Sequence, residues 1–123
     1  MRVESNIVKD KARDFAIRII NLYKHLTKNR TEFIISAQIL RSGTSIGANI
    51  AEALRGASKK DFRNKMYIAY KECGETLSWL DLLHATEYLS SEEYLSINND
   101  CEEISKILSS ITKTTRYNIT PHS

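Results

Sequence analysis

The residues with the clearest chemical potential are lysines and arginines, because their cationic side chains bind phosphates and other anions. Four of them crowd a tight turn expected between two helices: Arg55, Lys59, Lys60 and Arg63. Four more lie on one side of a helix expected at 6–28: Lys9, Arg13, Lys24 and Lys28. Repeated in an oligomer, a basic turn would multiply weak contacts to RNA or DNA. The alternative is a solvated face that keeps the protein soluble, since no recognisable nucleic-acid module or exposed aromatic run accompanies these charges.

The charge distribution along the chain is strongly asymmetric, although the net charge is only +3. Residues 1–71 contain 15 of the 18 lysines and arginines but only 6 of the 15 acidic residues. The remaining residues contain 3 basic and 9 acidic side chains. A chain polarised in this way favours either polyanion binding through its basic half or head-to-tail pairing with copies of itself.

Residues suited to catalysis or metal binding are few. Dimetal carboxylate sites in helical bundles need two Glu-x-x-His pairs and further glutamates that point inward. The sequence has one comparable pair, Asp81-x-x-His84, and its other histidines fall at the end of the first helix and in the C-terminal tail. Gly43 and Gly47 fall within a helix, so they form no phosphate-binding loop. We therefore expect a protein that is not an enzyme and that needs no metal or cofactor.

The helix expected at 32–55 carries two unusual stripes. A polar side chain recurs at every third or fourth position: Gln38, Arg41, Ser45, Asn49 and Glu52. These residues either line a shared pore or partner contact, or Arg41, Asn49 and Glu52 hydrogen-bond to other helices and fix their register. A second strip, Gly43, Gly47 and Ala51, has almost no side chain, so another backbone is expected to come close. Such a helix needs several neighbours, which favours a bundle and an oligomer of bundles.

Trp79 lies away from the main apolar stripe of the helix expected at 59–86. A large aromatic residue outside the core is typical of a protein–protein interface. The alternative is a second packing face within the same bundle. Trp79 is therefore a candidate interface residue.

Four helices joined by short turns are expected, because the only proline is Pro121 and apolar residues recur at helical spacing. Their expected bounds are 6–28, 32–55, 59–86 and 90–116. The expected caps are Thr31 as N-cap of the second helix, Gly56 as its left-handed C-cap, and the capping boxes Ser58–Asp61 and Ser90–Glu93. The sequence thus predicts an all-α protein with a single domain, 1–123, folded as an antiparallel up-down-up-down four-helix bundle.

The expected core consists of one apolar stripe on each helix. The stripes are Val8, Phe15, Ile19, Leu22 and Leu26; Ile35, Ile39, Ile46 and Ile50; Phe62, Met66, Ala69, Cys73, Leu77 and Leu80; and Tyr94, Ile97, Cys101, Ile104, Leu108 and Ile111. Both cysteines lie on these stripes, so we expect reduced core residues. No apolar run is long enough to span a bilayer and no leader is evident, which favours a cytoplasmic protein without a membrane partner.

Residues 41–52 read Arg-Ser-Gly-Thr-Ser-Ile-Gly-Ala-Asn-Ile-Ala-Glu and resemble the signature of the bacterial four-helix-bundle proteins called 23S rRNA intervening-sequence proteins. Lys-Asp-Phe at 60–62, Ala-Tyr-Lys-Glu at 69–72 and Glu-Thr at 75–76 also fit this family, so the resemblance covers nearly the whole chain. In the family, glycine often follows Asn-Ile-Ala-Glu directly, whereas here it comes only at Gly56. This departure slightly extends the second helix.

The resemblance implies a small non-enzymatic bundle that assembles as a ring-shaped homopentamer. Some members of the family are encoded inside insertions in ribosomal RNA genes, and some have been labelled ribosomal proteins. A related branch, the accessory proteins of diversity-generating retroelements, binds nucleic acid and a reverse transcriptase. Together with the basic residues, the resemblance predicts a homo-oligomer that binds RNA or other nucleic acid. The alternative is a scaffold or accessory subunit that recruits a protein without direct nucleic-acid contact.

Overall fold

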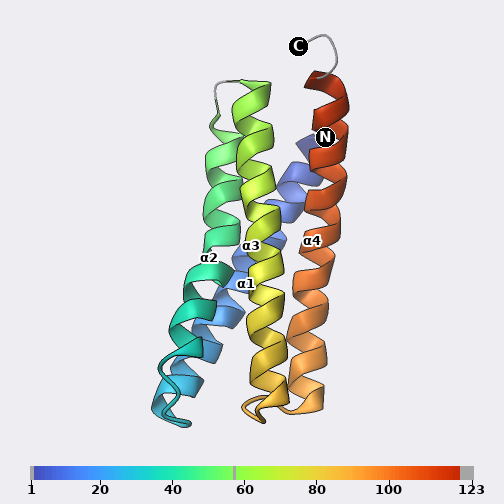
Figure 1. The fold of residues 1–123 in the computed structure, drawn as a ribbon. Helices are drawn as coiled ribbons and strands as arrows, with labels where there is room; N and C mark the ends of the chain where they lie inside the picture. Colours follow the sequence, from blue (N-terminus) through green and yellow to red (C-terminus); the bar gives the residue numbers. More distant parts are fainter. Residues whose placement is uncertain (1, 57, 120–123) are drawn as a thin grey trace.

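The computed structural model describes residues 2–56 and 58–119, and these residues form four α-helices and no β-strand. The helices are α1 (Arg2–Lys28), α2 (Ile35–Leu54), α3 (Lys59–Ala85) and α4 (Ser91–Ile119), as Figure 1 shows. The prediction of an all-α four-helix bundle is therefore confirmed. Within the described residues, no helix is both long and apolar enough to cross a membrane.

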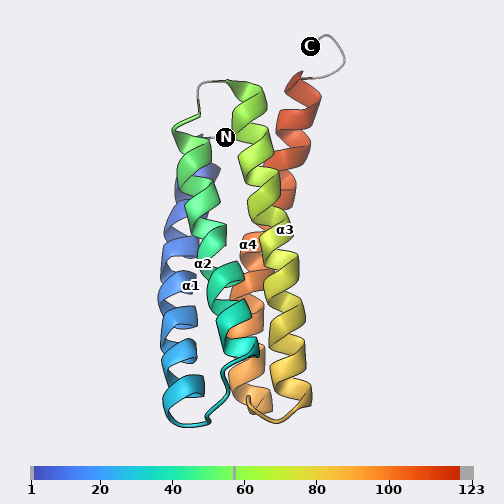
Figure 2. The same ribbon diagram turned by 60° about the vertical axis from the view of Figure 1, so that its left-hand side comes forward.

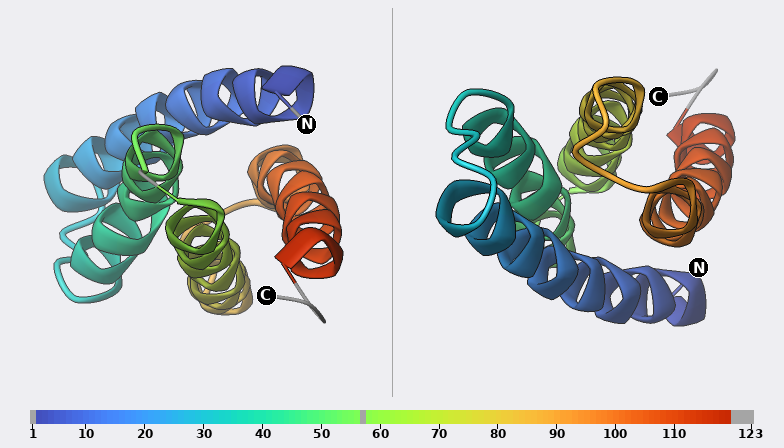
Figure 3. Two further views of the ribbon diagram at one scale, coloured as in Figure 1. Left: turned by 90° about the horizontal axis from the view of Figure 1, so that it is seen from above. Right: turned by 90° about the horizontal axis from the view of Figure 1, so that it is seen from below.

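Each helix contacts two others, in the order α1, α2, α3, α4 and back to α1, an arrangement that can be followed in the end-on views of Figure 3. Ion pairs show how α1 and α4 run past each other: Lys11 pairs with Glu103, and Arg18, further along α1, pairs with Asp100. Rising residue numbers on α1 thus meet falling numbers on α4, and consecutive helices alternate in direction in Figures 1 and 2. The start of α1, the α2–α3 connection and the end of α4 consequently share one end of the bundle, and the other two connections share the opposite end.

The interior of the bundle is apolar along its length. Every residue of the four expected stripes is either buried or packed against the buried core, so the predicted core is confirmed. Cys73 and Cys101 are buried free thiols, and the Cys101 sulfur lies 3.7 Å from the Cys73 carbonyl oxygen. The Cys73 side chain and burial raise the pKa of the Cys101 thiol above its ordinary value. This thiol is therefore uncharged and a poor nucleophile.

Helices α1 and α2 come close together where α2 carries glycine. A Cβ atom added at Gly43 would lie 2.8 Å from Cγ1 of Ile19 on α1, which is too close for two carbon atoms. A Cβ added at Gly47 would lie 3.6 Å from Cβ of Ala12, also on α1. The backbone that approaches the small-residue strip is therefore α1 of the same chain, while Ala51 is exposed.

The start of α2 differs from the sequence-based expectation. Thr31 is not the N-cap: its φ is +51°, and its hydroxyl donates to the carbonyl of Arg30. The carboxylate of Glu32 instead accepts from the backbone N–H groups of residues 34–36, at 3.1, 3.0 and 2.6 Å. Burial opposes ionisation of Glu32, but these three donors outweigh it and lower its pKa below the ordinary value. Because Glu32 occupies the capping role, α2 begins at Ile35 rather than near residue 32.

The capping interactions of α3 and α4 follow the predicted serine pairs. The Ser58 hydroxyl accepts from the N–H of Asp61 at 3.1 Å. At α4, the N–H of Ser90 donates to Oε1 of Glu93 at 2.9 Å, and the N–H of Glu93 donates to the Ser90 hydroxyl at 3.1 Å. The capping box at α4 is therefore reciprocal, and it satisfies donors that a helix start otherwise leaves unpaired.

The left-handed C-cap predicted at Gly56 is wrong, because no described glycine has a positive φ. Its N–H donates instead to the carbonyl of Ala53 at 3.1 Å. A Cβ atom added at Gly56 would lie only 3.1 Å from that same carbonyl oxygen. Glycine is therefore favoured here by the tightness of the turn and not by backbone handedness.

Candidate nucleic-acid interface

Three cationic side chains stand together at the α2–α3 connection. Arg55, Lys59 and Lys60 are exposed, and none of them has an ion-pair partner within the described residues. They are close because α2 ends at Leu54 and the Ser58 cap starts α3 only a few residues later. The N-terminus of α3 adds the positive end of a helix dipole at the same place. We call the part of the bundle around residues 55, 59 and 60 the basic end.

Arg63 lies one turn further along α3 and is less available. It is half-buried, and its guanidinium carbon lies 5.8 Å from the centroid of the Tyr67 ring. Its Nε atom is buried and finds no hydrogen-bond acceptor among the described residues. Arg63 therefore packs on its own helix, whereas the three cations before it extend into solvent.

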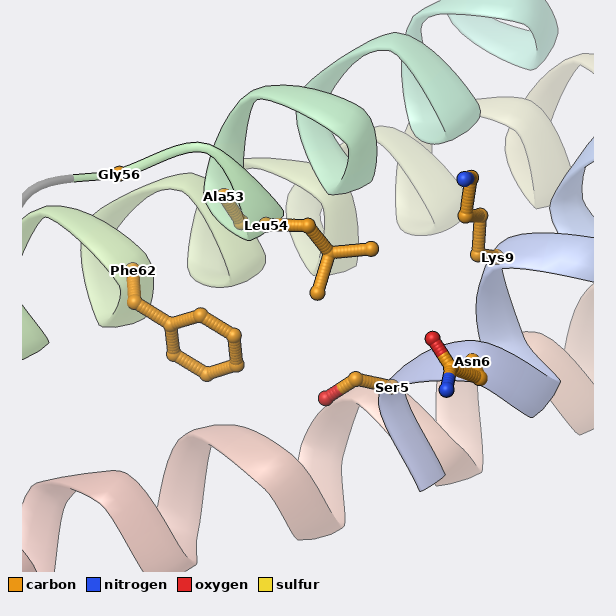
Figure 4. Close-up of a pocket in the computed structure, with 7 residues that line it drawn as sticks. All are labelled: Ser5, Asn6, Lys9, Ala53, Leu54, Gly56 and Phe62. Atoms are coloured by element: carbon orange, nitrogen blue, oxygen red, sulfur yellow. The ribbon is translucent and has the colours of Figure 1, made fainter. Parts of the chain in front are cut away.

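A pocket of about 670 Å³ lies beside the basic end, between the start of α1 and the α2–α3 connection. It is lined by Ser5, Asn6 and Lys9 from α1, Ala53 and Leu54 from α2, Gly56 from the connection, and Phe62 from α3. Figure 4 shows the Leu54 and Phe62 side chains directed into the space that faces α1. Lys9 is exposed and makes no ion pair within the described part of the chain. Lys9 therefore belongs with the basic end.

The other cations of the first-helix set lie away from this pocket. Arg13 is exposed and pairs with its neighbour Asp14 at 3.7 Å. Lys24 and Lys28 lie in the last part of α1, at the opposite end of the bundle in Figure 1. The structure thus divides the predicted basic set between two ends and brings Lys9 together with the cations of the α2–α3 connection.

Several cations on the sides of the bundle are already paired with carboxylates. Arg18 of α1 contacts Asp100 of α4 at 2.6 Å, and Lys65 of α3 contacts Glu52 of α2 at 2.6 Å. Exposed pairs of this kind contribute about 0–1 kcal/mol each to stability. Their main consequence here is that these cations already have anionic partners, whereas Arg55, Lys59 and Lys60 make no ion pair within the described residues, although Asp61 follows them in the first turn of α3.

Arg41 and Trp79 share one carboxylate. Arg41 of α2 donates to Glu75 and, at 3.2 Å, to Glu72, so it fixes α2 against α3. The indole N–H of Trp79 donates to Glu75 at 3.1 Å. Arg41 and then Trp79 hold the pKa of Glu75 below its ordinary value. Trp79 is half-buried against the core, so only part of its ring is open to another molecule.

The remaining members of the polar stripe differ in the partners of their side chains. Glu52 reaches Lys65 on α3. The expectation that Asn49 bonds to another helix is wrong: its amide donates to the carbonyl of Ser45, one turn earlier on α2, at 2.8 Å. That acceptor is close to any short polar side chain inside a helix. Gln38 is exposed and makes no side-chain hydrogen bond within the described residues.

Several polar contacts between segments were not anticipated, among them one made by Thr76 and those made by Arg30. The Thr76 hydroxyl of α3 donates to the buried hydroxyl of Ser42 on α2 at 2.9 Å. Arg30, between α1 and α2, donates to the carbonyls of Glu87 and Tyr88, each at 3.2 Å, and lies 4.8 Å from the Tyr88 ring centroid. Ser42 falls on the apolar stripe of its helix, which was a usable signal for a buried partner. Arg30 lies in a connection, where no periodic pattern exists.

The described residues contain no group of three or more histidine, cysteine or acidic side chains placed to hold a metal ion. The ring of His84 stacks on that of Tyr94 with centroids 4.4 Å apart, and its Nε2 lies 3.2 Å from the Ser91 hydroxyl. His84 thereby joins the end of α3 to the start of α4.

Comparison with known proteins assigns the chain to a family. Residues 4–110 match the family described as 23S rRNA-intervening sequence protein. A crystal structure of a protein with unknown function, from the S23 ribosomal protein family of Bacteroides thetaiotaomicron, is 58% identical to this chain. The match covers 89% of this chain and 98% of that one, with a TM-score of 0.88. A search of curated proteins found no significant match. The chain belongs to the 23S rRNA-intervening sequence protein family.

Proposed function

We propose that this antiparallel, up-down-up-down bundle is a non-enzymatic cytoplasmic protein that forms a ring-like homo-oligomer and binds RNA or other nucleic acid at its basic end. The observation that carries the proposal is the cluster of Arg55, Lys59 and Lys60, which are adjacent, exposed and unpaired within the described residues. A phosphate backbone is the polyanion that such a cluster binds, and release of its counterions drives the association. Lys9 extends the same positive surface across the pocket.

An oligomer would strengthen this binding, because each subunit would present one basic end to the same strand and the weak contacts would act together. The outer side of α3 supports assembly. Ile68 and Leu82 are 39% and 44% exposed there, and half-buried Trp79 lies on the same side of the helix. Apolar residues grouped among ion pairs are typical of protein interfaces. Light scattering should give a mass several times 14.1 kDa, and Ile68→Asp should lower it.

The binding proposal is tested by fluorescence anisotropy with single-stranded RNA, single-stranded DNA and duplex oligonucleotides at several salt concentrations. We expect the logarithm of the association constant to fall linearly with the logarithm of salt concentration. Lys59→Glu/Lys60→Glu should weaken binding far more than the matched double reversal Lys24→Glu/Lys28→Glu at the other end. Equal effects of the two reversals, or binding that does not respond to salt, would contradict the proposal.

A protein-recruiting scaffold is the second candidate function, and one observation favours it. Phe33 and Ile34, adjacent residues between α1 and α2, are 59% and 74% exposed. Two neighbouring apolar side chains that are this exposed are suited to contact another protein. If the wild-type protein binds no nucleic acid, a partner that is retained by the wild type and lost by Phe33→Ser/Ile34→Ser would support the scaffold.

A further inference from the structure

The pocket beside the basic end has the composition of a nucleobase site. We propose that it receives one unstacked base of a single-stranded nucleic acid, while the phosphates on either side of that base contact Arg55, Lys59 and Lys60. This inference rests on the proposed nucleic-acid binding and adds two statements to it: the bound form is single-stranded, and a base is held as well as the backbone.

The size and apolar surfaces of the pocket fit a base. Its volume of about 670 Å³ lies within the range of roughly 300–1,000 Å³ found for small-molecule sites. Phe62 contributes a flat ring that packs against the core and is half-buried. Part of the ring is therefore open to the pocket. Leu54 is 37% exposed and enters the same space from α2 (Figure 4). An aromatic ring with an aliphatic neighbour is a surface on which bases of any identity stack.

The α1 wall of the pocket supplies polar groups that can bond to a base or its phosphate. Asn6 and Lys9 are exposed, and neither side chain makes a hydrogen bond or ion pair within the described residues. An amide offers both donors and an acceptor, which is what the edge of a base requires. The ammonium group of Lys9 offers donors only and therefore suits a phosphate or a base carbonyl.

The position of the cations relative to the pocket favours a strand over a free small molecule. Arg55 lies between two pocket residues, Leu54 and Gly56. Lys59 and Lys60 lie in the same first turn of α3 as Phe62, with Asp61 between Lys60 and Phe62. A chain of phosphates that passes over these cations would bring an attached base to the mouth of the pocket. A duplex cannot use the pocket without unstacking and unpairing a base, which costs free energy. The arrangement therefore selects single strands.

The test compares neutral changes in the pocket with changes of charge beside it. Asn6→Leu fills part of the pocket and removes its amide without altering charge, and Asn21→Leu is a matched control on the same helix, in a different pocket of the bundle. Phe62→Leu removes the stacking ring but keeps an apolar side chain, and circular dichroism checks that it folds. Affinity is measured for a single-stranded RNA, for the same strand with abasic sites, and for its duplex.

We expect Phe62→Leu to weaken binding of the intact single strand by roughly five-fold to a hundredfold, the range found when one stacked base loses its aromatic partner. Asn6→Leu should also weaken it, because the amide that bonds to the base is lost. Both variants should bind the abasic strand as the wild type does, and Asn21→Leu should bind all ligands normally. If both pocket variants bind the intact strand like the wild type while Lys59→Glu/Lys60→Glu does not, the base site is refuted and the basic end stands. If the wild type prefers the duplex, the base site is also refuted. If the wild type binds none of the three ligands, both proposals fall.

Discussion

The two ends of the bundle differ in what their charged side chains contact, although both carry exposed cations that make no ion pair within the described residues: Lys24 and Lys28 at one end, and Arg55, Lys59 and Lys60 at the other. At the end that holds the α1–α2 and α3–α4 connections, Arg30 donates to two backbone carbonyls and Glu32 accepts from three backbone N–H groups. We call it the clamped end, because these contacts tie the connections to the helices. At the basic end, Arg55, Lys59 and Lys60 make no ion pair within the described residues. Charges that serve the chain's own backbone stabilise the fold, whereas unpaired charges are available to another molecule.

The largest expected effect is a loss of RNA affinity at the basic end without a loss of stability. Reversing Arg55, Lys59 and Lys60 together to glutamate should weaken RNA binding by roughly a hundredfold or more at low salt, because three phosphate contacts are replaced by repulsion. The slope of log affinity against log salt should also become shallower by about two, at roughly 0.7 per lost contact on a single strand. The melting temperature should hardly change, since surface substitutions of this kind alter stability by about 0.5 kcal/mol or less. A large fall in melting temperature would show that these cations serve the fold and would remove the contrast between the ends.

The next largest effect is expected on stability, where α1 packs closely against α2. Gly43→Ala places a Cβ atom 2.8 Å from Ile19 on α1, so α1 or the Ile19 side chain must move. We expect a loss of about 1–3 kcal/mol, measured by chemical denaturation at a fixed protein concentration. Gly74→Ala is the matched control, because an added Cβ there meets nothing within 4 Å. Alanine is favoured over glycine inside a helix, so this variant should be stabilised by up to about 1 kcal/mol. Equal effects of the two substitutions would mean that α1 does not rest closely on α2.

The parts of the molecule that sequence analysis predicted well are the ones that repeat. Apolar residues recurred at helical spacing on all four helices, and serine occurred three residues before an acidic residue at two helix starts. These patterns located the core, the N-cap at Ser58 and the capping box of Ser90 with Glu93. Long helices with clear periodicity are fixed by local rules, so their existence and buried faces follow from the sequence.

The parts that were missed depend on contacts between residues far apart in the sequence or on unusual backbone. Thr31 adopts a positive φ and does not cap α2. Glu32 accepts the hydrogen bonds of the cap instead. Arg30 bonds to carbonyls 57 and 58 residues away. Lys9 was grouped with other cations of α1 by helical spacing, but the pocket that it lines is completed by residues of α2, the α2–α3 connection and α3. The spacing of residues along one helix does not show which distant segment of the chain packs against that helix.

A smaller effect is expected from removing the clamp. Arg30→Ala deletes two charge-assisted hydrogen bonds to the carbonyls of Glu87 and Tyr88 and a cation–π contact with the Tyr88 ring. Because the site is exposed, we expect a loss of about 1 kcal/mol, less than the roughly 1.5–3 kcal/mol usual for a hydrogen bond to a charged group. The melting temperature should be lower by roughly 4 °C for a chain of this size. RNA affinity should stay within about two-fold of the wild type. Arg13→Ala, which removes an exposed cation paired only with its sequence neighbour, should change neither quantity.

The last effect, of similar size near pH 7 and smaller in acid, is expected at the Glu32 cap. Its folded-state pKa is lowered, so the ionised carboxylate contributes stability above its unfolded-state pKa of about 4.3, and this contribution is lost as the pH falls through the folded-state value. Near pH 7, Glu32→Gln should cost about 1 kcal/mol, the usual worth of a helix cap. The difference in melting temperature between wild type and Glu32→Gln should therefore shrink steadily below about pH 4.

Thermal melts of wild type, Glu32→Gln and the exposed control Glu102→Gln, recorded between pH 3 and pH 7, measure this difference. Glu102→Gln should track the wild type, because its side chain caps no helix within the described residues. RNA affinity at pH 7 should be the same for all three proteins, since Glu32 lies at the clamped end. A constant gap between wild type and Glu32→Gln across this pH range would mean that the hydrogen-bond geometry of the cap matters and its charge does not. A loss of RNA affinity in Glu32→Gln would show instead that the clamped end takes part in binding. The proposed contrast, in which one end stabilises the fold and the other binds nucleic acid, would then be wrong.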